Sequence, residues 1–145
     1  MTRIETIVAT VPCAAWLLLI SLGGCASMTA KTSLVGTQWR SLEVDGAPLP
    51  PEAAGHGGLE LGAEGNRYTA SAGCNRLLGS YQLAGERLTF RPGPMTRMAC
   101  RDPLAELEDK LIAALRAVTG YRIAGNRLEL LADDKVVARL TSPGP

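Results

Sequence analysis

The sequence predicts a β-rich α+β fold, in which a small antiparallel sheet or partly closed barrel carries one covering helix. Two observations predict it. Over most of the chain, short segments of alternating apolar and polar residues are separated by glycine-containing turns, as in hairpins. One segment, residues 102–120, instead repeats its apolar residues at spacings of three and four, as a helix with one buried face does.

The strands are predicted from their alternation and from the turns between them. Residues 59–61 and 67–71 flank a turn at Glu64-Gly65-Asn66 and are typical of a hairpin. Residues 81–90 and 121–130 match at five of ten positions, and each has a central Ala-Gly between two alternating arms, so we expect two further hairpins. Two similar hairpins arise by convergence or by duplication, and both origins stay open.

The predicted helix has both of its ends marked. Asp102 is expected to cap the first turn, Pro103 fits that turn, and Gly120 is a natural stop. Glu106 and Lys110 are spaced to pair on the outer face. The apolar stripe that must be buried consists of Leu104, Leu107, Leu111, Leu115 and Val118. A last strand is expected at residues 136–140.

Length and charge limit the functions that are open to the chain. Its 145 residues suit one domain. A net charge of +1 argues against binding nucleic acid by bulk electrostatics, and 4% aromatic residues are too few for a base-stacking platform. We therefore expect no nucleic-acid partner. Separately, we expect a monomer.

The N-terminal segment indicates export. The uncharged run from Ile7 to Leu22 contains Pro12 and is shorter than the about 20 apolar residues of a spanning helix. Residues 1–24 therefore have the features of a secretory signal peptide. The sequence Leu22-Gly23-Gly24-Cys25 resembles a bacterial lipobox, which implies cleavage before Cys25 and acylation of its thiol.

Three segments follow from this interpretation. Residues 1–24 are the lipoprotein signal peptide, residues 25–33 are a flexible tether of small and polar residues, and residues 34–141 are the folded domain. The acyl chains on Cys25 would anchor the protein to a membrane. Ala26 stands where an Asp commonly retains lipoproteins in the inner membrane, so we expect an outer-membrane protein that faces the periplasm.

Three clusters carry a resemblance to a known family. They are Gly36-Thr37-Gln38-Trp39, the stretch from Gly73-Cys74-Asn75 to Gly79 and Tyr81, and Thr96-Arg97-Met98-Ala99-Cys100. In this order, followed by a helix and closing strands, they resemble the META domain family, which includes the heat-shock lipoprotein HslJ. The resemblance covers about residues 33–140. It implies an association with stress, antibiotic tolerance or secretion, and it supplies no mechanism.

The cysteines agree with the resemblance. Cys13 would leave with the signal peptide and Cys25 would carry lipid, so Cys74 and Cys100 remain as a pair for a disulfide in an oxidising compartment. Closing the loop between them would stabilise the domain by roughly 3.5 kcal/mol. Free thiols, or a Cu(I) site in which Cys100 acts with Met95 and Met98, remain alternatives.

The sequence indicates no catalytic, metal or cofactor site. His56 is the single histidine and lies in a glycine-rich loop, where we expect it to be solvated. No phosphate-binding glycine pattern or HExxH motif is present, so we expect no enzyme activity and no cofactor. Asn75 and Thr96 are expected to satisfy backbone groups rather than to bind a ligand.

One stretch of the sequence is rich in arginine. An envelope protein or another anionic partner could bind there, and a solvated surface is the alternative. Glu86 is the only acidic residue in that stretch, whose arginines are Arg76, Arg87, Arg91, Arg97 and Arg101.

We expect a lipid-anchored, periplasmic, non-catalytic binding or envelope-stress module. The alternatives are a carrier of a small apolar ligand and an inhibitor of a periplasmic hydrolase. An apolar cavity of about 300 Å³ or more would favour the carrier. An exposed, rigid loop near Cys74 and Cys100 would favour the inhibitor.

Overall fold

The computed structural model describes residues 32–143, so the predicted signal peptide, Cys25 and most of the predicted tether lie outside the described residues. The described chain forms nine strands and one helix. Their bounds are β1 Gln38–Val44, β2 Ala47–Pro48, β3 Gly57–Leu61, β4 Arg67–Ala72, β5 Leu77–Ala84, β6 Arg87–Met95, α1 Leu104–Ala117, β7 Gly120–Ala124, β8 Arg127–Ala132 and β9 Lys135–Thr141. Within residues 32–143, no helix has the length and apolar character needed to cross a membrane.

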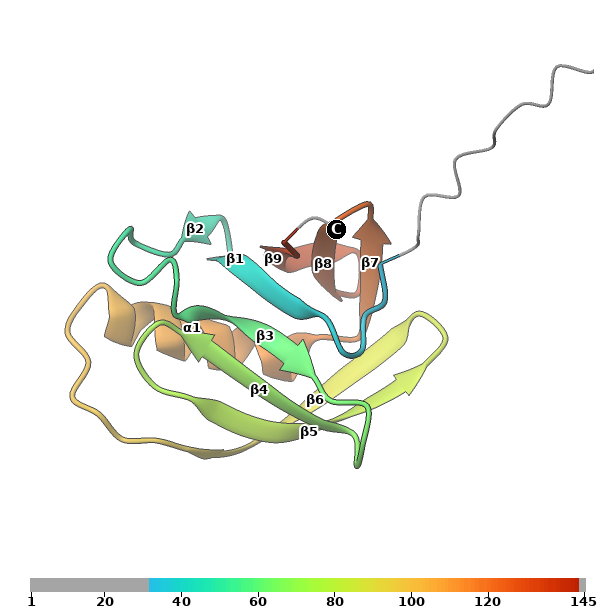
Figure 1. The fold of residues 1–145 in the computed structure, drawn as a ribbon, viewed down its shortest axis with the longest axis horizontal. Helices are drawn as coiled ribbons and strands as arrows, with labels where there is room; N and C mark the ends of the chain where they lie inside the picture. The colour runs from blue at the N-terminus through green and yellow to red at the C-terminus, as the bar shows by residue number, and fades with distance from the viewer. Residues whose placement is uncertain (1–31, 144–145) are drawn as a thin grey trace, which may run out of the picture.

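The strands form one antiparallel sheet that closes on itself (Figure 1). Their order is β2-β1-β3-β4-β5-β6-β7-β8-β9, and β1 also pairs with β9. The ring is weakest between β6 and β7, where Arg87 opposite Gly120 is the one pair in the register. The predicted β-rich fold with a partly closed barrel is therefore confirmed.

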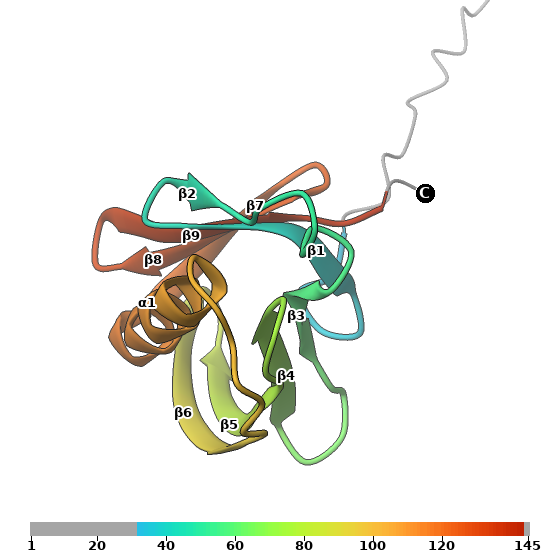
Figure 2. The ribbon, with the colours of Figure 1, turned by 90° about the vertical axis from the view of Figure 1, so that its left-hand side faces the viewer.

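Helix α1 covers the place where the ring opens. It follows β6 in the chain, and it contacts β6 and β4 on one side and β1, β8 and β9 on the other. Figure 2 shows it lying between β6 and β8. Leu107, Leu111, Ala114 and Leu115 are its buried apolar residues, and they belong to the core.

Both predicted helix ends need correction. Asp102 makes no capping hydrogen bond, and Pro103 occupies the N-cap position. The carbonyl oxygen of Arg101 accepts hydrogen bonds from the backbone N–H groups of Leu104 and Ala105, so these two groups of the first turn are bonded without a side-chain cap. At the other end, Gly120 does not stop the helix but begins β7.

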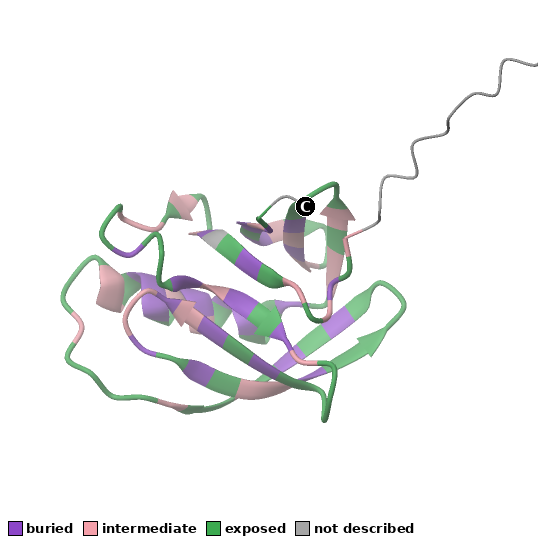
Figure 3. Ribbon diagram, viewed as in Figure 1, coloured by how far each residue is buried: buried purple, intermediate pink, exposed green. Residues whose placement is uncertain are grey.

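Side chains from the strands and from α1 form the core inside the barrel. Buried and exposed residues alternate along most strands (Figure 3). Trp39, Leu61, Leu88, Leu115 and Leu128 are fully buried. The predicted hairpins are present as β3–β4, β5–β6 and β7–β8, and the predicted last strand is β9. Strand β2 had no counterpart in the prediction, because its two residues are too few for any alternation to be visible.

Candidate functional site

The two motif loops are joined by a disulfide. Cys74 lies in the loop between β4 and β5, Cys100 lies in the loop between β6 and α1, and the structure links their sulfur atoms. The two loops are separated in sequence by the β5–β6 hairpin and meet at one end of it. The bond occupies the Cys100 thiol that the Cu(I) alternative would need.

Asn75 is the centre of a buried hydrogen-bond network at this junction. It is 5% exposed. Its Oδ1 accepts hydrogen bonds from the Met98 backbone N–H at 2.8 Å and from Thr96 Oγ1 at 2.9 Å. Its Nδ2 donates to the Met98 carbonyl at 3.3 Å and lies 3.0 Å from the Cys100 sulfur. Asn75 therefore fixes the backbone of the second loop from inside.

Glu108 completes the network from the helix. Its Oε1 accepts from Asn75 Nδ2 at 3.1 Å, and its Oε2 accepts from the Asn75 backbone N–H at 3.0 Å. The residue is 9% exposed, and within residues 32–143 it forms no ion pair. A carboxylate without a cation is costly to bury unless both oxygens are hydrogen-bonded, and Asn75 supplies both bonds.

Glu108 was not among the residues predicted from the sequence, although the sequence contained a signal. Glu108 is four residues after Leu104 and three before Leu111, so it lies on the apolar stripe of α1. A carboxylate at such a position needs a buried donor, and Asn75 is that donor.

Thr96 connects the second loop to the first. Its hydroxyl donates to Asn75 Oδ1 and accepts from the Arg76 backbone N–H at 3.0 Å. Its own N–H donates to the Arg76 carbonyl at 3.1 Å. Asn75 and Thr96 thus satisfy backbone groups, as predicted.

Two motif glycines allow close packing beside these loops. Gly73 has a φ of +102°, and a Cβ there would lie 2.5 Å from the Cβ of Ala53. Gly79 lies under the ring of Tyr68, and a Cβ would be 2.5 Å both from Tyr68 Cε1 and from the Arg91 carbonyl oxygen. Side chains at these positions would push the loop or the ring aside.

Tyr68 is buried with its hydroxyl unsatisfied. The ring is 2% exposed and meets Phe90 edge-on at 4.8 Å between centroids. The hydroxyl has no hydrogen-bond partner in the described part of the chain. Burial raises the pKa of Tyr68 to about 12, while the nearby positive charge of Arg116 opposes that rise.

The other motif residues hold the first strand and the barrel. The Gly36 N–H donates to the Leu61 carbonyl, and the Thr37 hydroxyl donates to the Ser33 carbonyl. The Trp39 indole donates to the Leu34 carbonyl at 3.1 Å. The Tyr81 hydroxyl donates to the Gly62 carbonyl at 2.8 Å.

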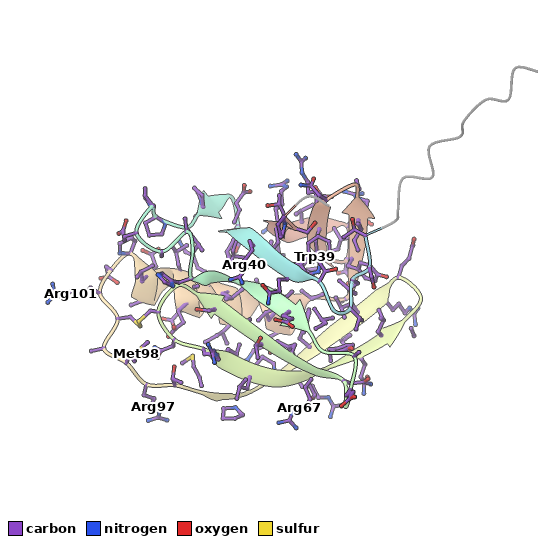
Figure 4. The ribbon with its side chains drawn as sticks, viewed as in Figure 1. Trp39, Arg40, Arg67, Arg97, Met98 and Arg101 are labelled. Carbon is purple, nitrogen blue, oxygen red and sulfur yellow. A yellow bond between two sulfur atoms is a disulfide. The ribbon has the colours of Figure 1, made fainter. Side chains whose placement is uncertain are left out.

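Arg97 and Met98 differ from the rest of the motif residues, because their side chains are exposed and contribute no hydrogen bond or ion pair within residues 32–143. Among the large apolar side chains of residues 32–143, Met98 is the most exposed, at 59%. In Figure 4 Arg97 and Arg101 lie on either side of Met98 along this loop. We call residues 96–101, with these three side chains, the presenting loop.

The structure separates the five arginines that the sequence grouped together. Arg76, Arg97 and Arg101 lie at the disulfide end. Arg91 lies on the outer face of β6, where Ser80 stands between it and Arg67 of β4. Arg87 begins β6, roughly 26 Å along the strand from the end that holds the disulfide.

Clefts open on the surface of the described part of the chain. A polar cleft of about 330 Å³ lies against β1, β3 and β4, and it is lined by groups of both charge signs, including Arg40, Glu60 and Arg76. His56 is exposed and lines this cleft. A second cleft of about 490 Å³ lies between β6 and α1. Within residues 32–143 no three His, Cys, Asp or Glu side chains gather as a metal site.

Comparison with known families identifies the family of this chain. The META domain model matches residues 32–144, which is most of the chain. The chain belongs to the META domain family. The matched span includes the barrel, the disulfide and the presenting loop of this META domain. No curated protein matches the chain in sequence.

Solved structures agree on the fold. An NMR structure of a protein from Burkholderia xenovorans is 26% identical, with a TM-score of 0.56 over 77% of this chain and 85% of that one. A crystal structure of a DUF4847 family protein from Bacteroides vulgatus is 13% identical, with a TM-score of 0.55 over 77% and 94%. A further NMR structure, at 24% identity, has a TM-score of 0.57 over 72% and 88%. The last two show the likeness of fold alone.

Proposed function

We propose that this META domain protein is a lipid-anchored envelope lipoprotein that performs no chemistry and binds a partner protein through the presenting loop. The sequence Leu22-Gly23-Gly24-Cys25 supports the anchor, and Ala26 supports the outer membrane. The Cys74–Cys100 disulfide supports an oxidising compartment such as the periplasm, because such bonds are rare in the cytosol.

The observation that carries the binding proposal is the way Asn75 holds Met98. Both backbone hydrogen-bonding groups of Met98 are bonded to the Asn75 side chain, and the disulfide fixes the loop two residues further on. The backbone is thus already ordered while the Met98 side chain remains exposed. A partner that binds a pre-ordered loop loses less conformational entropy, which favours affinity.

The exposed side chains indicate the chemistry of the partner. Methionine and arginine are both enriched in protein interfaces, and methionine adapts its shape to an apolar pocket. The presenting loop places Met98 between Arg97 and Arg101, which have no ion-pair partner within residues 32–143. The loop therefore suits an apolar pocket rimmed by carboxylates. Insertion into the cleft of a periplasmic hydrolase is one form of this contact and would make the protein an inhibitor.

Site-specific crosslinking in living cells tests the contact. A photo-reactive amino acid is placed at position 98, and the matched control is placed at Leu83, an exposed apolar residue at the far end of β5. We expect the photo-reactive residue at position 98 to crosslink to one envelope protein that the residue at position 83 does not capture. The same comparison is made in cells with and without heat stress. If position 98 yields no adduct beyond those of position 83, the presenting loop is not the contact.

Acyl labelling tests the anchor separately. In a Gram-negative host, the wild-type chain should incorporate labelled palmitate and fractionate with the outer membrane. Cys25→Ser should lose the label, whereas Cys13→Ser should keep it. A labelled Cys25→Ser chain, or a wild-type chain without label, would contradict the lipoprotein proposal.

A further inference from the structure

The cleft between β6 and α1 is a second candidate binding site. It has a volume of about 490 Å³, within the range of small-molecule sites. Leu77, Met95 and Ile112 give it an apolar wall, and these side chains also pack on the core. Arg97 and Arg116 lie on its lining as well.

The cleft exists because β6 extends beyond the part of it that pairs with β7. Strand β7 pairs with β6 only at Arg87, so the second half of β6 has no strand beside it on that edge. Pro92 and Pro94 lie in this half and have no N–H to offer a further strand, which is typical of an open edge. Helix α1 packs over the opening, and the cleft remains between them.

The charges on the lining have one sign. Arg97 and Arg116 form no ion pair in the described part of the chain, and the lining includes no acidic residue. The positive charge of Arg116 also acts on the hydroxyl of Tyr68, which is buried and unsatisfied. An apolar wall beside two free guanidinium groups is complementary to a molecule that is apolar at one end and anionic at the other.

We propose that this cleft binds a single-chain anionic amphiphile, such as a fatty acid or an alkyl phosphate. The acyl chain packs on Leu77, Met95 and Ile112, and the Arg97 and Arg116 guanidinium groups hold the anionic head group. Arg97 also belongs to the presenting loop, but Ile112 and Arg116 lie on α1, so this activity goes beyond binding a protein partner.

Calorimetry with three matched probes tests the proposal. The probes are lauric acid, dodecyl phosphate and the uncharged dodecanol, each below its micelle concentration. The protein is the predicted mature chain, residues 25–145, with Cys25→Ser, so that neither an acyl chain of its own nor the apolar run of the signal peptide competes. We expect at least one anionic probe to bind about tenfold or more tightly than dodecanol. The stronger anionic probe identifies the head group as a carboxylate or a phosphate.

Substitutions in the cleft should remove this binding. Arg116→Ala and Arg97→Ala should each lower the affinity for the anionic probe by about tenfold, and the affinity for dodecanol should not change. Ile112→Glu should abolish binding of every probe, because it places a carboxylate on the apolar wall. Arg67→Ala and Arg91→Ala are matched controls, because they remove the same charge from the outer face of β4 and β6.

Three results would overturn the proposal. The first is that no probe binds to the wild-type chain. The second is that dodecanol binds as tightly as the anionic probes. The third is that Arg67→Ala lowers the affinity for the anionic probe as much as Arg116→Ala does. Ile112 is partly buried, so the binding result for Ile112→Glu is interpreted only if circular dichroism shows that this variant is folded. The Arg97→Ala and Arg116→Ala variants test the proposal independently of that result. Capture of a partner at position 98 is a separate measurement, so either proposal can fail alone.

Discussion

The side chain of Asn75 hydrogen-bonds both backbone groups of Met98, which lies 23 residues away in sequence. The amide therefore takes the place that a neighbouring strand would occupy, and it does so at a single residue. Glu108 holds the same amide from the helix side. Three separate parts of the chain are thus fixed at one point, and the exposed Met98 side chain depends on buried groups for its position.

Replacing Asn75 should destabilise the whole domain. Asn75→Ala removes several hydrogen bonds and leaves the Glu108 carboxylate buried without its donor, so we expect the free energy of unfolding to fall by about 3 kcal/mol. Urea denaturation measures this loss. Asn126→Ala is the control, because Asn126 is exposed and its side chain makes one hydrogen bond, to Ser142. If both variants lost the same free energy of unfolding, the hydrogen-bond network around Asn75 would not be important for stability.

Reduction of the disulfide should weaken the fold. The bond closes a long loop in the unfolded chain, so Cys74→Ser with Cys100→Ser should lower the free energy of unfolding by roughly 3.5 kcal/mol. Chemical denaturation with and without a reductant measures the same loss in the wild-type chain. Mass spectrometry after alkylation checks the bond itself, and two alkylated thiols at these positions in the unreduced protein would contradict it.

A methyl group at Gly79 should not fit. Gly79→Ala brings a Cβ against the Tyr68 ring and the Arg91 carbonyl, and we expect a loss of about 2–3 kcal/mol in thermal or urea unfolding. Gly55→Ala is the matched control, because a Cβ there meets nothing within 4 Å. Its effect should stay within about 0.5 kcal/mol. A loss at Gly79 no larger than that would show that the ring can move aside.

Removal of the Tyr68 hydroxyl should stabilise the domain. The hydroxyl is buried without a partner, so Tyr68→Phe should raise the free energy of unfolding by about 1 kcal/mol at neutral pH.

The same substitution should change the pH dependence of stability. The folded-state pKa of Tyr68 is raised to about 12, whereas a tyrosine in the unfolded chain ionises near pH 10. The wild-type chain therefore loses stability between about pH 10 and pH 12, where only the unfolded state releases this proton. Denaturation across that range should show a steeper decline for wild type than for Tyr68→Phe. Parallel profiles would contradict the raised pKa.

Much of the fold follows from local patterns. Alternation and glycine turns predicted the hairpins, because each depends only on neighbouring residues. The helix ends were predicted less well. The carbonyl of Arg101 accepts from two N–H groups of the first turn, and no pattern of side chains reveals a backbone acceptor.

The candidate sites divide in the same way. The motif residues were predicted from the sequence. Which of them are buried and which are exposed on the presenting loop was not predicted. Glu108 was missed because its partner lies 33 residues away. The cleft beside Ile112 arises from the offset between β6 and β7, and strand register is not visible in the alternation of either strand.

The sequence by itself determined the hairpins, the helix, the family resemblance and the pair of cysteines that could join, because these depend on spacing along the chain. Only the tertiary structure decided that Asn75 would hold Met98 outward, that the arginines would separate and that a cleft would open beside α1. These outcomes depend on which strands pair and in what register, and that is set by how the whole barrel packs around Trp39 and the other core residues.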